Sequence, residues 1–245
     1  SIFMNDPESR NAFGPEIKHG IIDALRRAEQ DPEIRVIILA GEGKGFSSGG
    51  NVKKRMGEGN APADVKQRMD LTMKVLWLMH KIRKPVISAV HGYAVGAGLS
   101  LALAADLVVV ERTAKLRFAF RDIGLMPDAG AHYFLKRAVG PYKVKEWFWT
   151  GAMISPEEGE RLGIINRVVD EWKAYEEARK LARELAEGPA IAMGYSKSLL
   201  NSSVTNLDDL YEMEGFGQAI LFSTGDHFEG VRAFKEKRKP NFKGK

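Results

Sequence analysis

Short apolar runs alternate with helical stripes through the first two-thirds of the chain, and this alternation constrains the fold more than any other feature. Three runs of apolar and β-branched residues are typical of buried strands, at 34–40, 85–90 and 107–110. Apolar residues at helical spacing predict helices beside them, at 14–30, 65–82 and 99–105. A strand–helix–strand order favours right-handed crossovers, so we expect an α/β fold.

The last quarter of the chain has a different character. Ser155-Pro-Glu-Glu158 predicts a helix start, with Ser155 as N-cap and Pro at the first helical position. Residues 171–187 predict a charged amphipathic helix, Gly188-Pro189 a break, and 190–237 further helix. We therefore expect an α/β core over 1–187 and a helical C-terminal region over 188–245.

Composition excludes several kinds of chemistry. The 245 residues include no cysteine, which excludes disulfides, Cys-ligated zinc, iron–sulfur clusters and a Cys nucleophile. The five histidines show no metal-ligand spacing, so no metal site is expected. Apolar runs fall short of the roughly 18–20 residues that span a bilayer. No basic-then-apolar signal segment opens the sequence, and the expected location is cytoplasmic.

The positive charge of the chain is local. The net charge is +5, and residues 231–245 hold seven Lys/Arg against one Glu, so the remaining chain is close to neutral. This C-terminal cluster is either a solvated tail or an anion site for cofactor or nucleic-acid phosphates.

Two short patterns resemble catalytic motifs only weakly. Gly45-Phe-Ser47-Ser-Gly49 fits G-x-S-x-G, but the nucleophile elbow needs a strand directly before the serine and a helix directly after it. Gly96-Ala-Gly98 lies between two expected strands, but Leu101 stands where a dinucleotide-binding motif has its third glycine. Neither pattern predicts a function.

Two glycine-rich loops follow two of the expected strands, GFSSGGN (45–51) and GYAVGAG (92–98). Small residues let backbone N–H groups approach a ligand closely. Two such amides converging on one oxygen would form an oxyanion hole. Spacing alone does not show that the two loops meet.

With these loops in place, the chain resembles the crotonase family, also called enoyl-CoA hydratase/isomerase. The matching text covers nearly the whole chain: NDPESRNA (5–12), RVIILAGEGKGFSSGGNV, KPVISAVHGYAVGAGLSLALAADLVVV, TGAMISPEEGERLGIINRVV and FKEKRKPNFKG. The strand that usually precedes the first of these segments is expected to be missing or trimmed.

The resemblance implies a crotonase-like spiral of ββα units whose C-terminal helices assemble a trimer or a hexamer. It implies an acyl-CoA substrate, with no cofactor beyond the coenzyme A that the substrate carries, and no membrane or nucleic-acid partner. It places two oxyanion amides at Ser48 and Ala97, and acyl specificity within 52–75. Further substrate-binding positions follow from the same loops and their neighbour: Gly49, Asn51, Gly96, Gly98 and Phe120.

The two glutamates with which family hydratases handle water have no counterpart here. The resemblance aligns Ser100 and Phe120 with them. Addition of water needs one group to take a proton and one to deliver it, and these two residues do neither. An isomerase is therefore expected before a hydratase.

One acid, Asp128, stands at a position where some members of the family have a catalytic Asp. It lies in AFRDIGLMPDAG (119–130). This segment looks most like the isomerase branch that acts on ring-epoxidised phenylacetyl-CoA. Pro-Asp-Ala-Gly is also good turn sequence, and Asp128 could cap the following helix. The resemblance favours Asp128 as the catalytic base, surrounded by Phe118, Phe120, Leu125 and Met126. Burial among them would raise its pKa and make it a better base.

Three alternatives stay open at this stage. The first is an enoyl-CoA hydratase, a lyase of fatty acid metabolism. The second is an acyl-CoA hydrolase or dehalogenase with Asp128 as nucleophile. The third is an RNA-binding relative that uses the basic tail, although no nucleic-acid motif supports it.

Overall fold

The structure, a computed structural model, describes residues 1–52 and 61–245. Within these residues the main sheet is parallel, in the order β1 (Ile2–Met4), β2 (Ile37–Gly41), β3 (Val86–Val90), β5 (Leu107–Glu111), β8 (Arg167–Val169). A second sheet has the order β4 (Tyr93–Val95), β6 (Lys115–Arg117), β7 (Met153–Ile154). The helices are α1 (Pro15–Gln30), α3 (Pro62–Lys81), α4 (Ala97–Leu103), η1 (Ala119–Ile123), α5 (Ala131–Thr150), α6 (Pro156–Arg161), α7 (Ala174–Ala186), α8 (Ala190–Leu200), α9 (Leu207–Leu221) and α10 (Gly225–Glu236).

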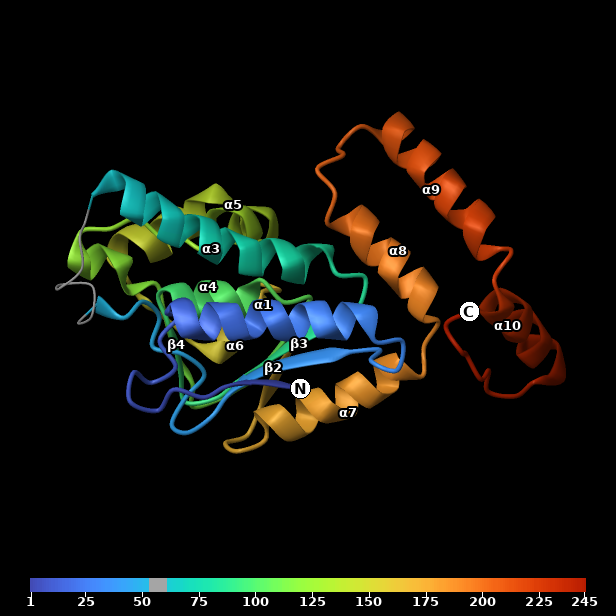
Figure 1. The fold of residues 1–245 in the computed structure, drawn as a ribbon, viewed down its shortest axis with the longest axis horizontal. Helices are drawn as coiled ribbons and strands as arrows, with labels where there is room; N and C mark the ends of the chain where they lie inside the picture. Colours follow the sequence, from blue (N-terminus) through green and yellow to red (C-terminus); the bar gives the residue numbers. More distant parts are fainter. Residues whose placement is uncertain (53–60) are drawn as a thin grey trace.

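Helices cover both faces of the main sheet, and Figure 1 shows α1 and α7 on opposite sides of β2 and β3. Successive residues along each strand point to opposite faces of the sheet and pack against different helices. Ile38 and Ile87 belong to the cluster that packs under α7, whereas Leu39 and Val86 belong to the larger core beneath α1 and α3. This double burial explains why the strands are almost continuously apolar in the sequence.

The chain winds as a spiral that adds one strand to each sheet in every turn. β3, β4 and α4 form one turn, and β5, β6 and α5 form the next. Ser47 pairs with Ala94 through a single parallel bridge, so that β2, Ser47 and α3 form the turn before them. The predicted α/β spiral of ββα units with C-terminal helices is confirmed.

Short strands account for most differences from the expected elements. A strand, β1, does precede the NDPESRNA segment, and its Ile2 pairs with Leu39 of β2. The expectation that this strand would be missing is wrong. β4 lies inside the expected 91–98 loop, and α4 begins at Ala97 rather than at residue 99. Two- and three-residue strands are too short for a periodic pattern, so only their partners define them.

A buried ion pair joins the C-terminal helices to the core. Lys197 on α8 donates to Asp106 Oδ2 at 2.6 Å, and the same oxygen accepts the Val86 N–H at 2.7 Å. The side chains of Lys197 and Asp106 are only 9% and 23% exposed. Burial raises the pKa of the Asp106 carboxyl and lowers the pKa of the Lys197 amine, while their pairing opposes both shifts. Removing one partner would leave a poorly compensated charge.

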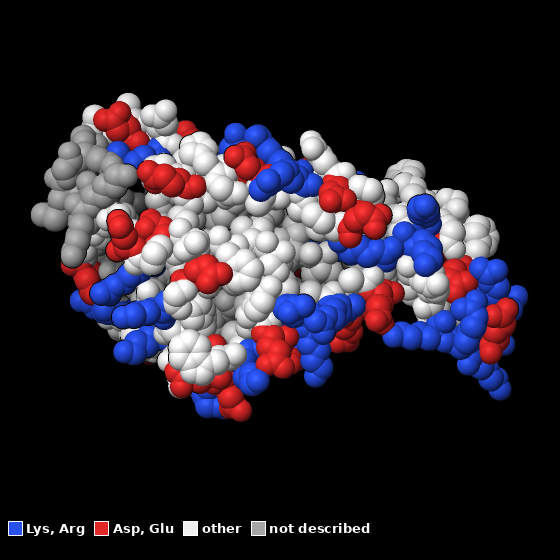
Figure 2. Space-filling model, turned by 60° about the horizontal axis from the view of Figure 1, so that its bottom comes forward, with Lys and Arg blue, Asp and Glu red and all other residues white. Residues whose placement is uncertain are grey.

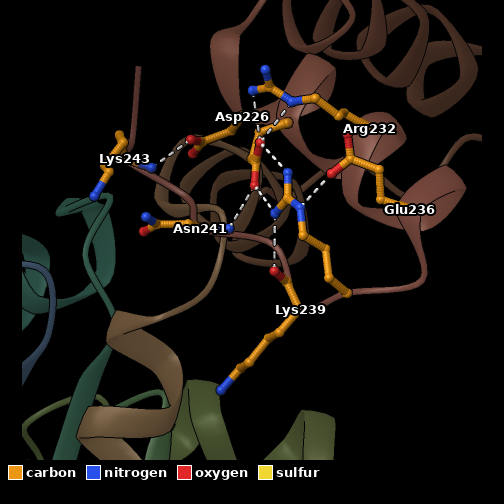
Figure 3. Close-up of polar contacts among 8 residues, drawn as sticks. Asp226, Arg232, Glu236, Lys239, Asn241 and Lys243 are labelled. Carbon is orange, nitrogen blue, oxygen red and sulfur yellow. Dashed lines mark hydrogen bonds and ion pairs between the residues drawn. The ribbon is translucent and has the colours of Figure 1, made fainter.

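The basic C-terminal segment folds back onto α10 through two carboxylates (Figure 3). Asp226, 5% exposed, accepts the backbone N–H groups of Lys243 and Gly244 at 2.6 and 2.9 Å. Glu229 accepts hydrogen bonds from Arg238 at 2.6 Å and Arg232 at 2.8 Å. On the face drawn in Figure 2, Lys and Arg gather at the right-hand end, where the C-terminal helices lie, with acidic side chains among them.

Neither a membrane-spanning helix nor a metal-binding cluster of side chains is found among the described residues. No helix within residues 1–52 and 61–245 is long and apolar enough to cross a membrane. Across the same residues, no group of three or more His, Asp or Glu side chains is arranged to hold a metal ion.

Replacing Glu229 by Gln is expected to change how stability depends on pH. The Arg238 guanidinium, the Asn241 N–H and Arg232 lower the pKa of Glu229 to about 2, below its ordinary 4.5. A depressed carboxyl pKa stabilises the fold above the unfolded-state value, and that contribution is lost as pH falls through the folded-state value. The difference in melting temperature between the wild type and E229Q should therefore be full above pH 4.5 and shrink towards pH 2.

Thermal unfolding followed by circular dichroism across this pH range provides the measurement. The exposed Glu212 on α9 offers a matched control, and E212Q should follow the wild type throughout. A constant gap between E229Q and the wild type would contradict the assignment.

Candidate active site

The first glycine loop is attached to the second by backbone pairing. The Ser47 N–H donates to the Tyr93 carbonyl at 3.1 Å, and the Val95 N–H donates to the Ser47 carbonyl at 3.1 Å. Ser47 is fully buried, and its Oγ donates to the Asn11 carbonyl at 2.7 Å. Ser47 is therefore a structural residue, and the exposed serine that a nucleophile elbow requires is not present at this position.

The two loops come within contact distance because glycine stands where they cross. A Cβ at position 98 would lie 2.7 Å from both Cβ and O of Ser47. A Cβ at position 49 would lie 2.4 Å from the Val95 carbonyl oxygen and 3.3 Å from the Ala97 nitrogen. The expected meeting of the two loops therefore occurs, with Gly49 beside the start of α4.

Ser48 does not fit its expected role. In the structure its N–H donates to the Arg10 carbonyl oxygen at 3.0 Å, and its Oγ donates to the Ser9 carbonyl at 2.9 Å. Consecutive amides of an extended segment point to opposite sides. Because the Ser47 N–H faces β4, the Ser48 N–H faces the turn before α1. We correct the Ser48 expectation on this ground.

Two other amides remain beside this crossing. The Gly49 N–H is used locally, since it donates to Ser47 Oγ at 3.2 Å. Among the residues that the structure describes, no acceptor is recorded for the N–H groups of Gly50 and Ala97. Ala97 is the first residue of α4, so its N–H has no partner within the helix. The sequence alone pointed to Ala97 but missed Gly50, because the direction of each amide depends on the pairing with β4.

No carboxylate stands at the two positions aligned with the glutamates. Ser100 is fully buried in α4, with its Oγ 3.4 Å from the Gly96 carbonyl. Phe120 is 7% exposed in η1, and its ring would lie 3.8 Å from a Cβ at Gly96. The surface next to Gly96, where the two glycine loops cross, is therefore formed by the apolar ring of Phe120.

Asp128 lies in the turn between η1 and α5. Its carbonyl accepts the Ala131 N–H at 3.2 Å, and its carboxyl Oδ1 is shielded from solvent. The expected apolar surroundings are only partly present in the chain. Phe118 is fully buried, but Leu125 and Met126 are 52% and 78% exposed. They extend outward because the segment between η1 and α5 is on the surface.

The remaining predicted position, Asn51, is half-buried at the end of the first described range. It lines a cavity of about 130 Å³ with the Lys18 and Arg68 side chains. Of the 52–75 segment expected to govern acyl specificity, residues 53–60 lie outside the described residues. The two histidines at the loops have structural contacts: His91 Nε2 contacts the Gly43 carbonyl at 2.9 Å, and His132 packs on Phe148.

Comparison with known proteins gives a consistent result. The family described as enoyl-CoA hydratase/isomerase matches residues 1–245. The 1,2-epoxyphenylacetyl-CoA isomerase of Escherichia coli is 36% identical over 100% of this chain and 95% of its own length. The crotonyl-CoA hydratase of Syntrophomonas wolfei is 30% identical over 98% of this chain and 93% of its own. A crystal structure of an enoyl-CoA hydratase from Polaromonas superposes with a TM-score of 0.94, at 34% identity, covering 98% of this chain and 94% of that chain.

Replacing Gly98 by Ala is expected to separate the two loops. The new Cβ meets the Ser47 backbone, which cannot yield because it is hydrogen-bonded to β4. We expect a loss of about 1–3 kcal/mol in the free energy of unfolding and of roughly 10²-fold in turnover.

Urea unfolding and steady-state kinetics measure the two effects. The control is Gly20→Ala on α1, where a Cβ meets nothing within 4 Å. G20A should be as stable as the wild type or more so, with unchanged turnover. Wild-type stability and turnover in G98A would show that the loops do not need this contact.

Proposed function

This chain belongs to the enoyl-CoA hydratase/isomerase family, and from that premise we propose that it is an enzyme that isomerises acyl-CoA thioesters through an enolate. The observation that carries the proposal is the crossing of the two glycine loops, which is so close that a Cβ at position 49 would lie 3.3 Å from the Ala97 nitrogen. Coenzyme A is then part of the substrate, and no separate cofactor is required.

The oxyanion hole in this proposal consists of the N–H groups of Gly50 and Ala97. Ala97 retains its expected role, and Gly50 replaces Ser48 because the Ser48 amide already has an acceptor. Both donors belong to the backbone, and they would polarise the thioester carbonyl as negative charge develops on its oxygen. Removing one such donor typically costs ~10²–10³ in rate. The glycines at 49, 96 and 98 leave room for the thioester.

Isomerisation is preferred to hydration because, among the residues that the structure describes, Asp128 is the one acid that the resemblance assigns to the site. Ser100 and Phe120 supply no carboxylate to position a water and to deliver its proton. In the proposed reaction, Asp128 removes a proton from the carbon next to the carbonyl of a 3-enoyl-CoA. The resulting dienolate is held by the two amides. Asp128 then returns the proton to the far carbon, and the double bond becomes conjugated with the thioester.

Hydration remains the second candidate, because one of the similar proteins is named a crotonyl-CoA hydratase. In that case some group other than a glutamate at positions 100 and 120 would handle the water.

Replacing Asp128 by Asn tests the proposed base. The amide has nearly the same shape but cannot accept the substrate proton at neutral pH, so we expect kcat to fall by at least ~10². Each enzyme is incubated in heavy water with a 3-enoyl-CoA and with a 2-enoyl-CoA, and the products are analysed by mass spectrometry. The wild type should form the conjugated isomer with deuterium and without added water.

The control is Asp122→Asn, six residues earlier in the same segment. Asp122 pairs with Arg117 at 2.8 Å, and its loss should leave turnover within ~3-fold, as is usual for exposed pairs. Full turnover in D128N would remove Asp128 from the mechanism. Net addition of water by the wild type would make the enzyme a hydratase.

The C-terminal helices are proposed to assemble the protein as a homotrimer, or as a hexamer of two trimers. Large apolar side chains are exposed on α8–α10 and the turns between them, among them Leu200, Leu207, Tyr211, Phe216, Phe222 and Phe234. Residues of α8, α9 and α10 also line a surface cavity of about 540 Å³ whose walls are largely apolar. Such patches mark protein contacts.

Replacing Phe216 by Lys is expected to dissociate this assembly, because a charge would enter the buried centre of the contact. Phe216 is 69% exposed in the single chain. Analytical ultracentrifugation should find a trimer or hexamer for the wild type and smaller species for F216K. The equally exposed Trp149 on α5 provides the control, and W149K should leave the assembly intact. A monomeric wild type would contradict the proposal.

A further inference from the structure

The turn before α1 is held in an unusual backbone conformation. Arg10 and Asn11 are consecutive non-glycine residues with φ values of 60° and 55°. Side chains with a Cβ rarely adopt this left-handed region, and asparagine does so more readily than most residues. The conformation turns both carbonyl groups toward the first glycine loop. Arg10 O accepts the Ser48 N–H at 3.0 Å, and Asn11 O accepts Ser47 Oγ at 2.7 Å.

The Asn11 side chain connects this turn to the segment that leads from β2 into the loop. It is 1% exposed. Its Oδ1 accepts the Asp6 N–H at 2.9 Å, and its Nδ2 donates to the carbonyls of Glu42 and Gly45 at 2.8 and 3.0 Å. Only a carboxamide offers an acceptor and two donors within this short reach. Asn11 thus holds both ends of the bend between β2 and the loop.

The loop in turn carries Gly50, one of the two proposed oxyanion donors. Downstream of Gly45, the Ser47 backbone pairs with β4, and the Gly49 carbonyl accepts the Phe13 N–H at 2.7 Å. A Cβ added at position 49 would lie 3.3 Å from the Ala97 nitrogen, so this part of the loop lies beside the start of α4. The hydrogen bonds of Asn11 therefore reach the neighbourhood of Ala97 through the segment 45–50.

We propose that Asn11 is a positioning residue, whose buried carboxamide sets the place of the Gly50 N–H relative to the Ala97 N–H and thereby the strength of the oxyanion hole. It acts through the loop and not on the substrate. This inference rests on the proposed function, since it assigns the residue that holds the proposed amides. It accounts for a buried polar side chain and two left-handed residues outside the site itself.

The main variant is Asn11→Gly, because glycine adopts the left-handed conformation freely and lacks the carboxamide. A displacement of the amide by a fraction of an ångström weakens the hydrogen bond in the transition state more than ground-state binding. We expect kcat to fall roughly 10–100-fold, while KM and the affinity for a saturated acyl-CoA such as butyryl-CoA stay within ~3-fold.

A spectroscopic readout separates this role from a general loss of stability. Acetoacetyl-CoA forms an enolate with a near-ultraviolet absorbance band, and an oxyanion hole lowers the apparent pKa of the bound ligand. In N11G this pKa should shift back towards the free value by about the logarithm of the loss in kcat. Asn11→Asp keeps the acceptor oxygen but turns a carboxylate toward two carbonyls, and it should be at least as impaired.

The control is Asn166→Gly, which removes another carboxamide that bridges two backbone segments. Asn166 Oδ1 accepts the Val108 N–H at 2.7 Å, at the junction of β5 and β8. N166G should lower the melting temperature and leave both kcat and the enolate pKa unchanged. If N11G does not fold, N11D takes its place, because it replaces the two Nδ2–H donors to Glu42 and Gly45. Ser47→Ala tests the backbone side of the same connection, because it removes the Oγ that joins Asn11 O to the Gly49 N–H.

The outcomes are distinct. A lower kcat with a raised enolate pKa in N11G or N11D, with the same direction of change in S47A, supports the proposal. Wild-type kcat and enolate pKa in the folded variant overturn the role of Asn11 and leave the proposed function standing. A wild-type protein that binds acetoacetyl-CoA without lowering its pKa overturns the oxyanion hole itself, and with it any role in positioning that hole.

Discussion

The close approach of two backbone loops is the constraint on which the candidate site depends. At Gly98 the chain passes so near Ser47 that a single Cβ would meet its side chain and carbonyl at 2.7 Å. Backbone hydrogen bonds between Ser47 and β4 hold the loops at this distance. The spiral of ββα units brings the loops together because each turn adds its strands beside those of the turn before. A site made from backbone amides needs such closeness, since an amide cannot reach across a gap as a long side chain does.

The chemistry of the site then depends on what surrounds these amides. At the two positions that the resemblance aligns with hydratase glutamates, this chain has a buried serine whose Oγ faces its own helix and a phenylalanine ring packed beside Gly96. An apolar wall keeps water away and strengthens the remaining electrostatic interactions. In the proposed mechanism the same wall favours moving one proton over adding a water molecule. The proposal for Asn11 extends this logic outward, from the amides to the turn that holds their loop.

Several charged side chains of the C-terminal region form ion pairs within the chain, which the sequence did not indicate. In the sequence, residues 231–245 form a basic tail suited to an anionic partner. In the fold, Arg232 and Arg238 bind Glu229, and Lys239 pairs with Glu187, the residue directly after α7. The ion pair of Lys197 with Asp106 links α8 to the sheet in a similar way. Three of the seven basic side chains of residues 231–245 therefore bind carboxylates of the chain itself.

The sequence by itself determined the α/β class, the positions of the buried strands along the chain, the helical character of residues 190–237, and the identity of Ser100 and Phe120. These features rest on local patterns: runs of apolar residues, helical spacing and residue identity at matching positions. Tertiary structure decided which amides face the site. The resemblance placed an oxyanion amide at Ser48, but pairing of Ser47 with β4 turns the Ser48 N–H toward Arg10. The short strands β1 and β4 and the contacts of the Asn11 side chain with the first loop likewise depend on partners more than 20 residues away in sequence. No local pattern encodes the direction of a hydrogen bond whose acceptor lies in another part of the chain.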